Sequence, residues 1–357
     1  MLKAYKYRIY PDAEQMQFFA KCFGCVRFVY NRMLSDRIEH YNLTGKSLNN
    51  TPAQYKSEFT WLKEVDSLAL ANAQMNLNTA YRNFFRDKSN GFPKFKSKKN
   101  NNFSYTTNNQ KGTVYVENGY IKLPKLKSPV KIRQHRSFEG VIKSCTISKA
   151  PSGKYHISIL VETEIQKLPA SDMRVGIDVG IKDFAVLSNG EAYKNPKHLR
   201  KSEKRLAKLQ RDLSRKQIGS SNRNKARIKV AKLHEKIANQ RMDFLHKKST
   251  EIIRKNQAIV IEDLKVKNLM KNHNLAKSIA EVSWSRFREM LDYKSRWYGR
   301  ELIIAPPDYP SSQLCSDCGN RSSQTKDLAC RVYICPECGL EIDRDYNASL
   351  NLLKLTM

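Results

Sequence analysis

The chain ends in two cysteine pairs, Cys315-Ser316-Asp317-Cys318 and Cys335-Pro336-Glu337-Cys338, followed at once by Asp343-Arg344-Asp345-Tyr346-Asn347. A glycine follows each pair, at Gly319 and Gly339, as is typical of the knuckles that wrap a metal ion. Two pairs at this spacing predict a zinc ribbon in which Cys315, Cys318, Cys335 and Cys338 bind one structural Zn²⁺. Because four thiolates fill the tetrahedral zinc site, no position is left open for a catalytic water.

The carboxylates beyond the fourth cysteine do not belong to that zinc site. We interpret them together with two earlier acids, each of which ends an apolar, strand-like run. Asp178 follows residues 175–177, and Glu262 follows residues 259–261. Asp345 begins a final helical stretch. Hydrolysis of a phosphodiester uses divalent cations, and such hard cations bind carboxylates. The pattern indicates a metal-dependent nuclease, although each acid alone is as often a simple strand or helix cap.

Composition limits the class of protein. The chain has 357 residues, 40% of them hydrophobic, which is enough for two or three folded domains. Its formal net charge is +31, from 65 Lys and Arg against 34 Asp and Glu, spread along the whole length. An extended nucleic acid is the natural counter-charge, whereas a ribosomal type of protein would explain the charge alone.

Localisation is predicted from what the chain lacks. No stretch approaches the roughly 18 apolar residues of a membrane-spanning helix, and the N-terminus shows no signal peptide. We therefore expect a cytoplasmic protein with reduced thiols and no membrane partner. A further pair, Cys22-Phe23-Gly24-Cys25, lies in an apolar helical pattern without a second pair, so we expect buried helical cysteines rather than a metal site.

The N-terminal half predicts a β domain interrupted by helices. Residues 3–10 alternate like a strand, and helical patterns follow at 13–41 and from 67 to 85. Strands are predicted at 113–116, 120–123, 141–148 and 155–161, with the first strand joining them in a small barrel or sheet. Residues 90–99 mix aromatics with lysines, including Lys94 and Lys96, a pattern that suits phosphate contact and base stacking.

The C-terminal half predicts an α/β domain. Strands are expected at 175–178, 184–188, 258–262 and 301–305, and an amphipathic helix at 282–298. Residues 195–256 are charged and helical, broken only at 219–221, and predict an antiparallel helix pair. Their lysine and arginine excess favours a pair that faces nucleic acid over a simply solvated one.

Together these stretches resemble the TnpB family, the transposon-encoded insertion-sequence OrfB proteins related to type V CRISPR nucleases. The specific part is residues 176–182, 261–264 and 343–348 with the cysteine ribbon before the last of them. Supporting stretches are residues 3–11, 27–31, 92–96, 282–284 and 309–313. The family's catalytic acids, which resemble RuvC motifs, fall on Asp178, Glu262 and Asp345. Asp343 ranks second for the third position, because the family's acid directly precedes the x-Asn-Ala step.

The resemblance implies a multidomain α+β fold. It consists of a β-barrel wedge domain (1–11 and 101–170) with a helical recognition insertion (12–100). A ribonuclease H-like (RuvC) α/β domain follows (171–308 and 343–357, with the basic helix pair at 195–256), into which the zinc ribbon (309–342) is inserted. The expected cofactors are structural Zn²⁺ on the four cysteines and catalytic Mg²⁺ on Asp178, Glu262 and Asp345.

The resemblance also implies the partners, the activity and a nucleoid-associated protein of a prokaryote. We expect an RNA-guided DNA endonuclease that uses a guide RNA from the transposon end and cuts double-stranded DNA beside a short motif, one copy per guide. Lys6, Arg8, Lys94 and Lys96 are the expected nucleic-acid contacts. Two alternatives stay open, a DNA-binding transposase or accessory factor with a ribonuclease H-like core, and a guided DNA-binding repressor that does not cut.

Overall fold

The computed structural model describes residues 1–100, 103–323, 325 and 330–356. The chain divides into two compact units, Met1–Glu164 and Ile165–Met357. Residues 165–170 lie with the second unit, where the Leu168 N–H donates to the Tyr298 carbonyl at 3.1 Å. The boundary that we predicted at residue 101 lies outside the described residues.

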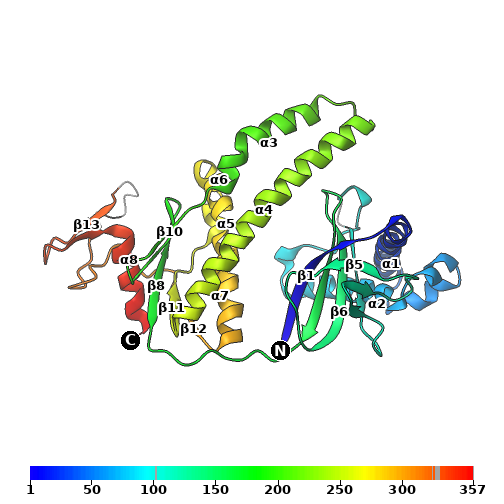
Figure 1. Ribbon diagram of the computed structural model, residues 1–357, viewed down its shortest axis with the longest axis horizontal. Helices are drawn as coiled ribbons and strands as arrows, with labels where there is room; N and C mark the ends of the chain where they lie inside the picture. The colour runs from blue at the N-terminus through cyan, green and yellow to red at the C-terminus, as the bar shows by residue number, and fades with distance from the viewer. Residues whose placement is uncertain (101–102, 324, 326–329, 357) are drawn as a thin grey trace. The chain divides into compact units, whose positions relative to one another are not determined.

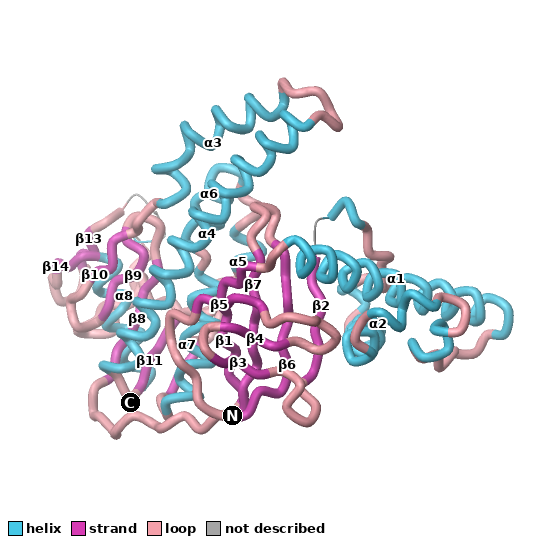
Figure 2. The backbone as a smooth tube through the Cα atoms, turned by 45° about the vertical axis from the view of Figure 1, so that its right-hand side comes forward, coloured by secondary structure: helices cyan, strands magenta, loops and turns pink. Residues whose placement is uncertain are grey.

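The first unit is built on one antiparallel sheet of seven strands in the order β2-β6-β7-β1-β5-β4-β3 (Figure 2). The N-terminal strand β1 lies inside the sheet between β7 and β5, which confirms that it joins the later strands. In the described residues β2 and β3 are the sheet's two edges, so backbone pairing does not close it into a barrel. The strands are β1 (Leu2–Tyr10), β2 (Phe103–Asn108), β3 (Tyr115–Glu117), β4 (Tyr120–Lys122), β5 (Val130–Arg133), β6 (Val141–Lys149) and β7 (Tyr155–Glu162).

Two long helices follow β1, α1 (Ala13–Thr44) and α2 (Ser67–Arg86). Helix α1 begins with a reciprocal capping box between Asp12 and Gln15, which satisfies two helix-end donors. It ends at Gly45, whose φ of 67° suits a left-handed C-cap. Short 3₁₀ turns connect and follow the helices, η1 (Pro52–Lys56), η2 (Thr60–Glu64), η3 (Lys88–Asn90) and η4 (Lys98–Asn100).

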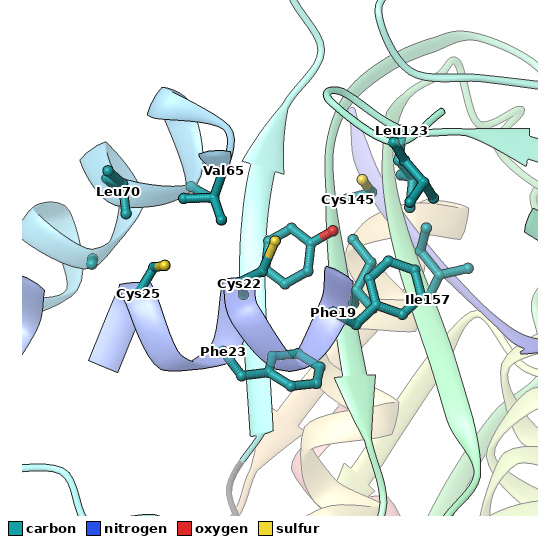
Figure 3. Packing of buried hydrophobic residues seen from close by; sticks show 14 of the residues in the cluster. Phe19, Cys22, Phe23, Cys25, Val65, Leu70, Leu123, Cys145 and Ile157 are labelled. Atoms are coloured by element: carbon teal, nitrogen blue, oxygen red, sulfur yellow. The ribbon is translucent and has the colours of Figure 1, made fainter. Parts of the chain in front are cut away.

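The cysteine pair of α1 is part of the first unit's core, as predicted. Cys22 and Cys25 are 1% and 4% exposed, and Figure 3 shows them among Phe19, Phe23 and Val65. Burial raises the pKa of the Cys25 thiol to about 11, so it stays protonated at neutral pH. This pair therefore packs as two small apolar side chains of the core.

The second unit contains a mixed sheet of five strands in the order β10-β9-β8-β11-β12. The first three are antiparallel neighbours, and β11 runs parallel to both β8 and β12. Strand β11 is buried along its whole length, because its apolar run has neighbours on both sides. The strands are β8 (Arg174–Val179), β9 (Asp183–Leu187), β10 (Ala192–Lys194), β11 (Ala258–Ile261) and β12 (Glu301–Ile304).

Helices α3 (His198–Ser214) and α4 (Ser221–Lys255) run side by side in opposite directions (Figure 1). The predicted pair and its break near residue 219 are thus confirmed. The predicted helix 282–298 is confirmed as α7 (Trp284–Tyr298), which begins after Ser283 with its left-handed φ of 58°. A separate helix that the sequence did not predict, α6 (His273–Val282), ends just before that residue. The other elements are α5 (Val266–Leu269), β13 (Val332–Ile334), β14 (Glu341–Asp343), α8 (Arg344–Leu353) and η6 (Lys354–Thr356). No helix in the described part of the chain is long and apolar enough to cross a bilayer.

Candidate active site and cysteine cluster

Two of the predicted acids come together through the register of parallel strands. Ile177 of β8 pairs with Ile261 of β11, so Asp178 and Glu262 occupy the next position on neighbouring strands. Neighbouring strands lie about 4.8 Å apart, which places both acids at the same edge of the sheet. The apolar runs 175–177 and 259–261 hold these strand ends in place, because they are buried in the unit's core.

Helix α8 brings the third acid, and Gly176 is the reason it can approach. A Cβ atom at Gly176 would lie 2.1 Å from the Ser349 carbonyl oxygen and 2.5 Å from the Leu353 nitrogen. Only a glycine allows the backbones of β8 and α8 to come this close. Asp345, in the first turn of α8, is thereby carried toward the end of β8. Ser349 itself is fully buried, and its hydroxyl donates to the Tyr346 carbonyl.

All three acids line one cavity of 560 Å³. Asp178 and Glu262 are partly buried, and the Asp345 side chain is 19% exposed. Their oxygens do not form a cluster as tight as that of the cysteines, whose ligand atoms all lie within 4.8 Å of one another. All three acids therefore contribute to the wall of a single cavity.

The electrostatics of the cavity disfavour three free carboxylates. Burial raises the pKa of Asp178 well above its ordinary value, and the charges of Glu262 and Asp345 raise it further. Burial also raises the pKa of Glu262, whereas the Ser311 hydrogen bond and Arg344 lower it. Perturbed acids of this kind cluster at functional sites, because a cation or proton is needed to relieve the repulsion.

The structure separates Asp345 from its competitor Asp343. Asp343 is the N-cap of α8, and one carboxylate oxygen accepts hydrogen bonds from the N–H groups of Asp345 and Tyr346, both at 3.0 Å. Asp345 lines the cavity instead. The division of labour follows from helix geometry, since a residue just before a helix reaches back to its free N–H groups.

Three further cavity neighbours were not predicted from the sequence. The Ser311 hydroxyl donates to Glu262 and orients that carboxylate. Arg344 lies 3.6 Å and Arg331 lies 4.0 Å from the two Asp345 oxygens, and both arginines line the cavity. Ser311 lies inside the 309–313 stretch, and Arg344 lies between the two aspartates. The sequence motifs therefore include both residues, but they do not predict which acids these residues contact.

The four ribbon cysteines gather as predicted. The Cys315 and Cys338 sulfurs are 3.6 Å apart, and those of Cys318 and Cys335 are 3.5 Å apart. A tetrahedral site with Zn–S bonds of about 2.3 Å places its sulfurs roughly 3.8 Å apart, so the donor set fits Zn²⁺. Gly319 supports the first knuckle with a φ of 76° while its N–H donates to the Cys315 carbonyl.

Two buried asparagines tie this ribbon to α8. Asn347 accepts from the Ser316 N–H at 2.9 Å and donates to the Leu314 carbonyl at 2.7 Å. Asn351 donates to the carbonyls of Ser311 and Leu314. Neither asparagine is more than 1% exposed, so these bonds are shielded from water. The ribbon is therefore attached to the helix that carries Asp345 and to the serine that orients Glu262.

The predicted nucleic-acid contacts all lie in the first unit, away from this site in sequence. Lys94 and Lys6 are exposed. Lys96 is held in place, because Asn31 bonds both its backbone N–H and its carbonyl while its ammonium lies 4.0 Å from the Tyr30 ring centroid. The Arg8 guanidinium lies 4.9 Å from the Tyr10 ring centroid.

Family models match three parts of the chain. A model described as "Probable transposase" (OrfB_IS605) covers residues 156–273, and one described as "Cas12f1-like, TNB domain" covers residues 284–352. A third, described as a helix-turn-helix domain of the same OrfB group, covers residues 1–46. In that region the structure has strand β1 and the single long helix α1.

Relatives match nearly the whole chain. A Streptomyces pristinaespiralis protein named "Putative RNA-guided DNA endonuclease" is 42% identical over 98% of this chain and 88% of its own length. The Escherichia coli K12 protein named with the same activity and the symbol InsQ is 34% identical over 99% of this chain and 92% of its own length.

A solved structure shares the fold. The protein in a cryo-EM structure of a Cas12f1–sgRNA–target DNA complex superposes with a TM-score of 0.64 at 16% identity, over 99% of this chain and 98% of that one. Given the identity and coverage of the bacterial relatives, the chain belongs to the TnpB family of insertion-sequence OrfB proteins.

Proposed function

We propose that the chain is an RNA-guided DNA endonuclease of transposon origin whose hydrolytic centre is formed by Asp178, Glu262 and Asp345. The observation that carries the proposal is the convergence of these acids, from three separate elements, on one cavity in which burial raises the pKa of Asp178 and of Glu262. The activity itself follows the names of the full-length relatives. A ribonuclease H-like (RuvC) assignment of the mixed five-stranded sheet belongs to the same proposal.

The carboxylate cavity fits divalent cations with a preference for oxygen ligands, such as Mg²⁺. Its acids supply hard anionic donors, and their mutual repulsion is relieved by positive charge. Asp178, Glu262 and Asp345 would hold the ions. When bound, such ions activate water and neutralise charge at the phosphorus.

The chain's own residues prepare this chemistry. Ser311 fixes the rotamer of Glu262 through its hydrogen bond, and Arg344 restrains Asp345 through an ion pair. Arg331, at the cavity wall, offers a guanidinium to the anionic phosphodiester that must enter. Because the acids are partly buried, fewer water molecules surround them, and each of these electrostatic contacts is stronger than it would be in bulk water.

The ribbon would act on the site indirectly. Zn²⁺ on the four cysteines supplies rigidity rather than an open coordination position. The Arg344 backbone N–H donates to the Arg331 carbonyl at 2.9 Å, and its side chain reaches the Cys330 carbonyl. A folded ribbon thus holds Arg331 and the start of α8 in the geometry that presents Asp345.

Nucleic acid would bind along the basic surface of both units. A net charge of +31 remains after the chain's own acids are counted, and a guide RNA with its DNA target would supply the opposite charge. Lys6, Arg8, Lys94 and Lys96 are the proposed contacts of the first unit. The aromatics Phe92 and Phe95, 45% and 55% exposed, alternate with the two later lysines along the chain and offer stacking faces. We propose one protein per guide RNA.

Within this function the first unit, with its sheet and helical insertion, would hold the guide–target duplex and the flanking motif. Base pairing supplies the sequence specificity in such systems, so the protein needs charge and shape more than base contacts. A strand-transfer function is the second candidate, favoured by the description "Probable transposase" of one matching model. It differs in needing no guide RNA.

The decisive test begins with the protein purified from cells that carry its own flanking DNA. Sequencing of the copurified RNA should give one dominant species that ends in sequence from outside the element. Heterogeneous RNA, or none, would favour direct recognition of transposon ends and the strand-transfer function.

The recovered RNA then programs a cleavage assay in Mg²⁺. Asp178→Ala and Glu262→Ala should each reduce single-turnover cutting by about a thousandfold or more, while guide and target affinities change little. Asp263→Asn is the matched control, because Asp263 is adjacent to Glu262 but pairs with Arg288 and does not line the cavity. Tight binding without any cutting by the wild type would instead identify a guided repressor.

A further inference from the structure

The cavity with the three carboxylates has a second wall that hydrolysis does not use. It is apolar and comes from the segment after β11 and from α6 and α7, through Leu264, Leu275, Ile279 and Trp284. At 560 Å³ the cavity is within the range of roughly 300–1,000 Å³ that holds small organic ligands. A cation site alone needs no such wall, because metal ions and water gain nothing from aliphatic side chains.

Trp284 marks this wall as a binding surface. The side chain lines the cavity and is only 7% exposed, yet its indole N–H is buried without a hydrogen-bond partner in the part of the chain that the structure describes. A buried tryptophan N–H nearly always has an acceptor. The residue also directly follows Ser283, whose φ of 58° is a strained backbone for a non-glycine residue and of the kind found at ligand sites.

Two lysines border the same cavity and are positioned by one asparagine. The Asn195 side chain donates to the Ile181 carbonyl at 2.8 Å and accepts from the Lys197 N–H at 3.1 Å. It thereby ties the loop that carries Lys182 to the start of α3. Lys182 and Lys197 are both exposed cavity residues, and Lys197 has a left-handed backbone with φ of 49°. Ammonium groups beside an apolar wall match a ligand that has apolar parts joined by anionic groups.

We propose that this wall is a nucleoside subsite for the DNA strand being cut. The base and sugar of a nucleotide flanking the scissile phosphate would lie against Leu275 and Ile279 and accept a hydrogen bond from the Trp284 indole N–H. Neighbouring phosphates would lie near Lys182 and Lys197. The inference rests on the proposed function, because the carboxylates that share the cavity define where the scissile phosphate enters. It assigns to Trp284 the role of a substrate-positioning residue.

A crosslinking experiment tests the subsite without relying on cutting. The protein is assembled with its guide RNA and a target in Mg²⁺-free buffer, with a single 5-iodouracil placed at successive positions around the mapped cut site. Irradiation should crosslink the probe to the peptide that contains Trp284 at one or two adjacent positions. Crosslinks that occur only at Trp61, Trp297 or other peptides would overturn the proposal.

A kinetic experiment tests the hydrogen bond. Trp284→Phe keeps an aromatic ring but removes the N–H, and it should slow single-turnover cutting about three- to tenfold, the range expected for one net hydrogen bond. An abasic substitution at the crosslinked position should slow the wild type but have a clearly smaller effect on Trp284→Phe. Trp297→Phe is the matched control, because Trp297 lies in the same helix, packs against Tyr293 and is not a cavity residue. It should cut at the wild-type rate.

A second variant keeps the test valid if Trp284→Phe does not fold. Leu275→Trp would fill the cavity from α6, and it should slow cutting while the melting temperature and guide-RNA binding remain near the wild type. If the wild type cuts an abasic target at its normal rate, and if both variants also cut at the wild-type rate, the subsite is refuted while the proposed nuclease function stands. A wild type that does not cut with any guide would contradict the proposed function instead.

Discussion

The cysteine cluster and the carboxylate cavity lie in the same unit, but the chain assembles them in different ways. The four cysteines fall within residues 315–338, and local knuckles bring their sulfurs within 4.8 Å of one another. The acids are spread from residue 178 to residue 345 and meet only because β8, β11 and α8 pack together. One site therefore depends on local turns, and the other depends on the packing of the whole unit.

The two sites also differ in their electrostatics. When four thiolates bind Zn²⁺, the free energy of zinc binding contributes to the free energy of folding of the ribbon. The acids are instead partly buried, and this burial, with a smaller contribution from the neighbouring carboxylates, raises the pKa of Asp178 and of Glu262. The ribbon should thus be stable only with its ion, whereas the carboxylate cavity should persist, under strain, without one.

The largest effect should come from breaking the local site. Cys315→Ser should abolish zinc binding and unfold the ribbon, and cutting should fall about tenfold to a hundredfold, as when groups that orient metal ligands are lost. Zinc content by mass spectrometry and single-turnover cutting measure both effects. Cys330→Ser is the control, because Cys330 is outside the cluster and serine retains a donor for the Val332 carbonyl. A wild type purified without zinc would refute the zinc site.

A smaller effect should come from breaking the packing that assembles the acids. Gly176→Ala places a methyl group 2.1 Å from the Ser349 carbonyl oxygen, which should lower the free energy of unfolding by about 3 kcal/mol and displace Asp345. Zinc should stay bound, which distinguishes this variant from Cys315→Ser. Chemical denaturation and zinc content measure the result.

The control is the same substitution at a position in helix α1. Gly24→Ala in α1 meets no atom within 4 Å, and alanine is the better helix former, so it should stabilise the chain by about 0.5–1 kcal/mol. Equal effects of the two substitutions would show that close packing of β8 on α8 is not what assembles the acids.

The smallest effect should come from relieving the repulsion. Asp178→Asn removes one of the like-charged carboxylates. It should raise the free energy of unfolding of the Mg²⁺-free protein by about 0.5–2 kcal/mol near pH 8. The sign follows from the raised pKa of Asp178, because the wild type loses stability as the pH rises from the unfolded pKa through the folded one. The gain should therefore vanish in acid, where the wild-type carboxyl is also protonated.

Thermal melts of both proteins from pH 4 to pH 8 measure this difference. Magnesium should raise the melting temperature of the wild type and have little effect on Asp178→Asn. Asp317→Asn, an exposed acid of the ribbon, is the control and should change stability by less than about 0.5 kcal/mol. A variant less stable than the wild type at pH 8 would show that the acids do not repel one another.

Much of the fold could be predicted from patterns that act over short distances. Alternation identified β1 and β7, and helical spacing identified α1 and the α3–α4 pair, since each pattern reflects which face of an element is buried. Strand β5 was not predicted, because its four residues carry too little pattern. Helix α6 was also not predicted, and nothing local in the sequence requires the left-handed Ser283 that separates it from α7.

The candidate site shows the same division. Motif spacing pointed to the four cysteines, and strand ends pointed to Asp178 and Glu262. The choice between Asp343 and Asp345 rested on resemblance, whereas the structure gives Asp343 the helix cap and Asp345 the cavity wall. Arg331, Lys197 and Trp284 could not be assigned, because a solvated surface and a cavity wall use the same residue types.

The sequence by itself determined the zinc knuckles, the strongly basic character and the family, because these depend on spacing and composition. Only the tertiary structure decided how Gly176 lets α8 reach β8, how Asn347 and Asn351 attach the ribbon to that helix, and which side chains face the carboxylates. The physical reason is distance along the chain. Contacts between residues that are tens to more than a hundred positions apart follow from the packing of complete elements, and a local pattern records only which face of an element is buried.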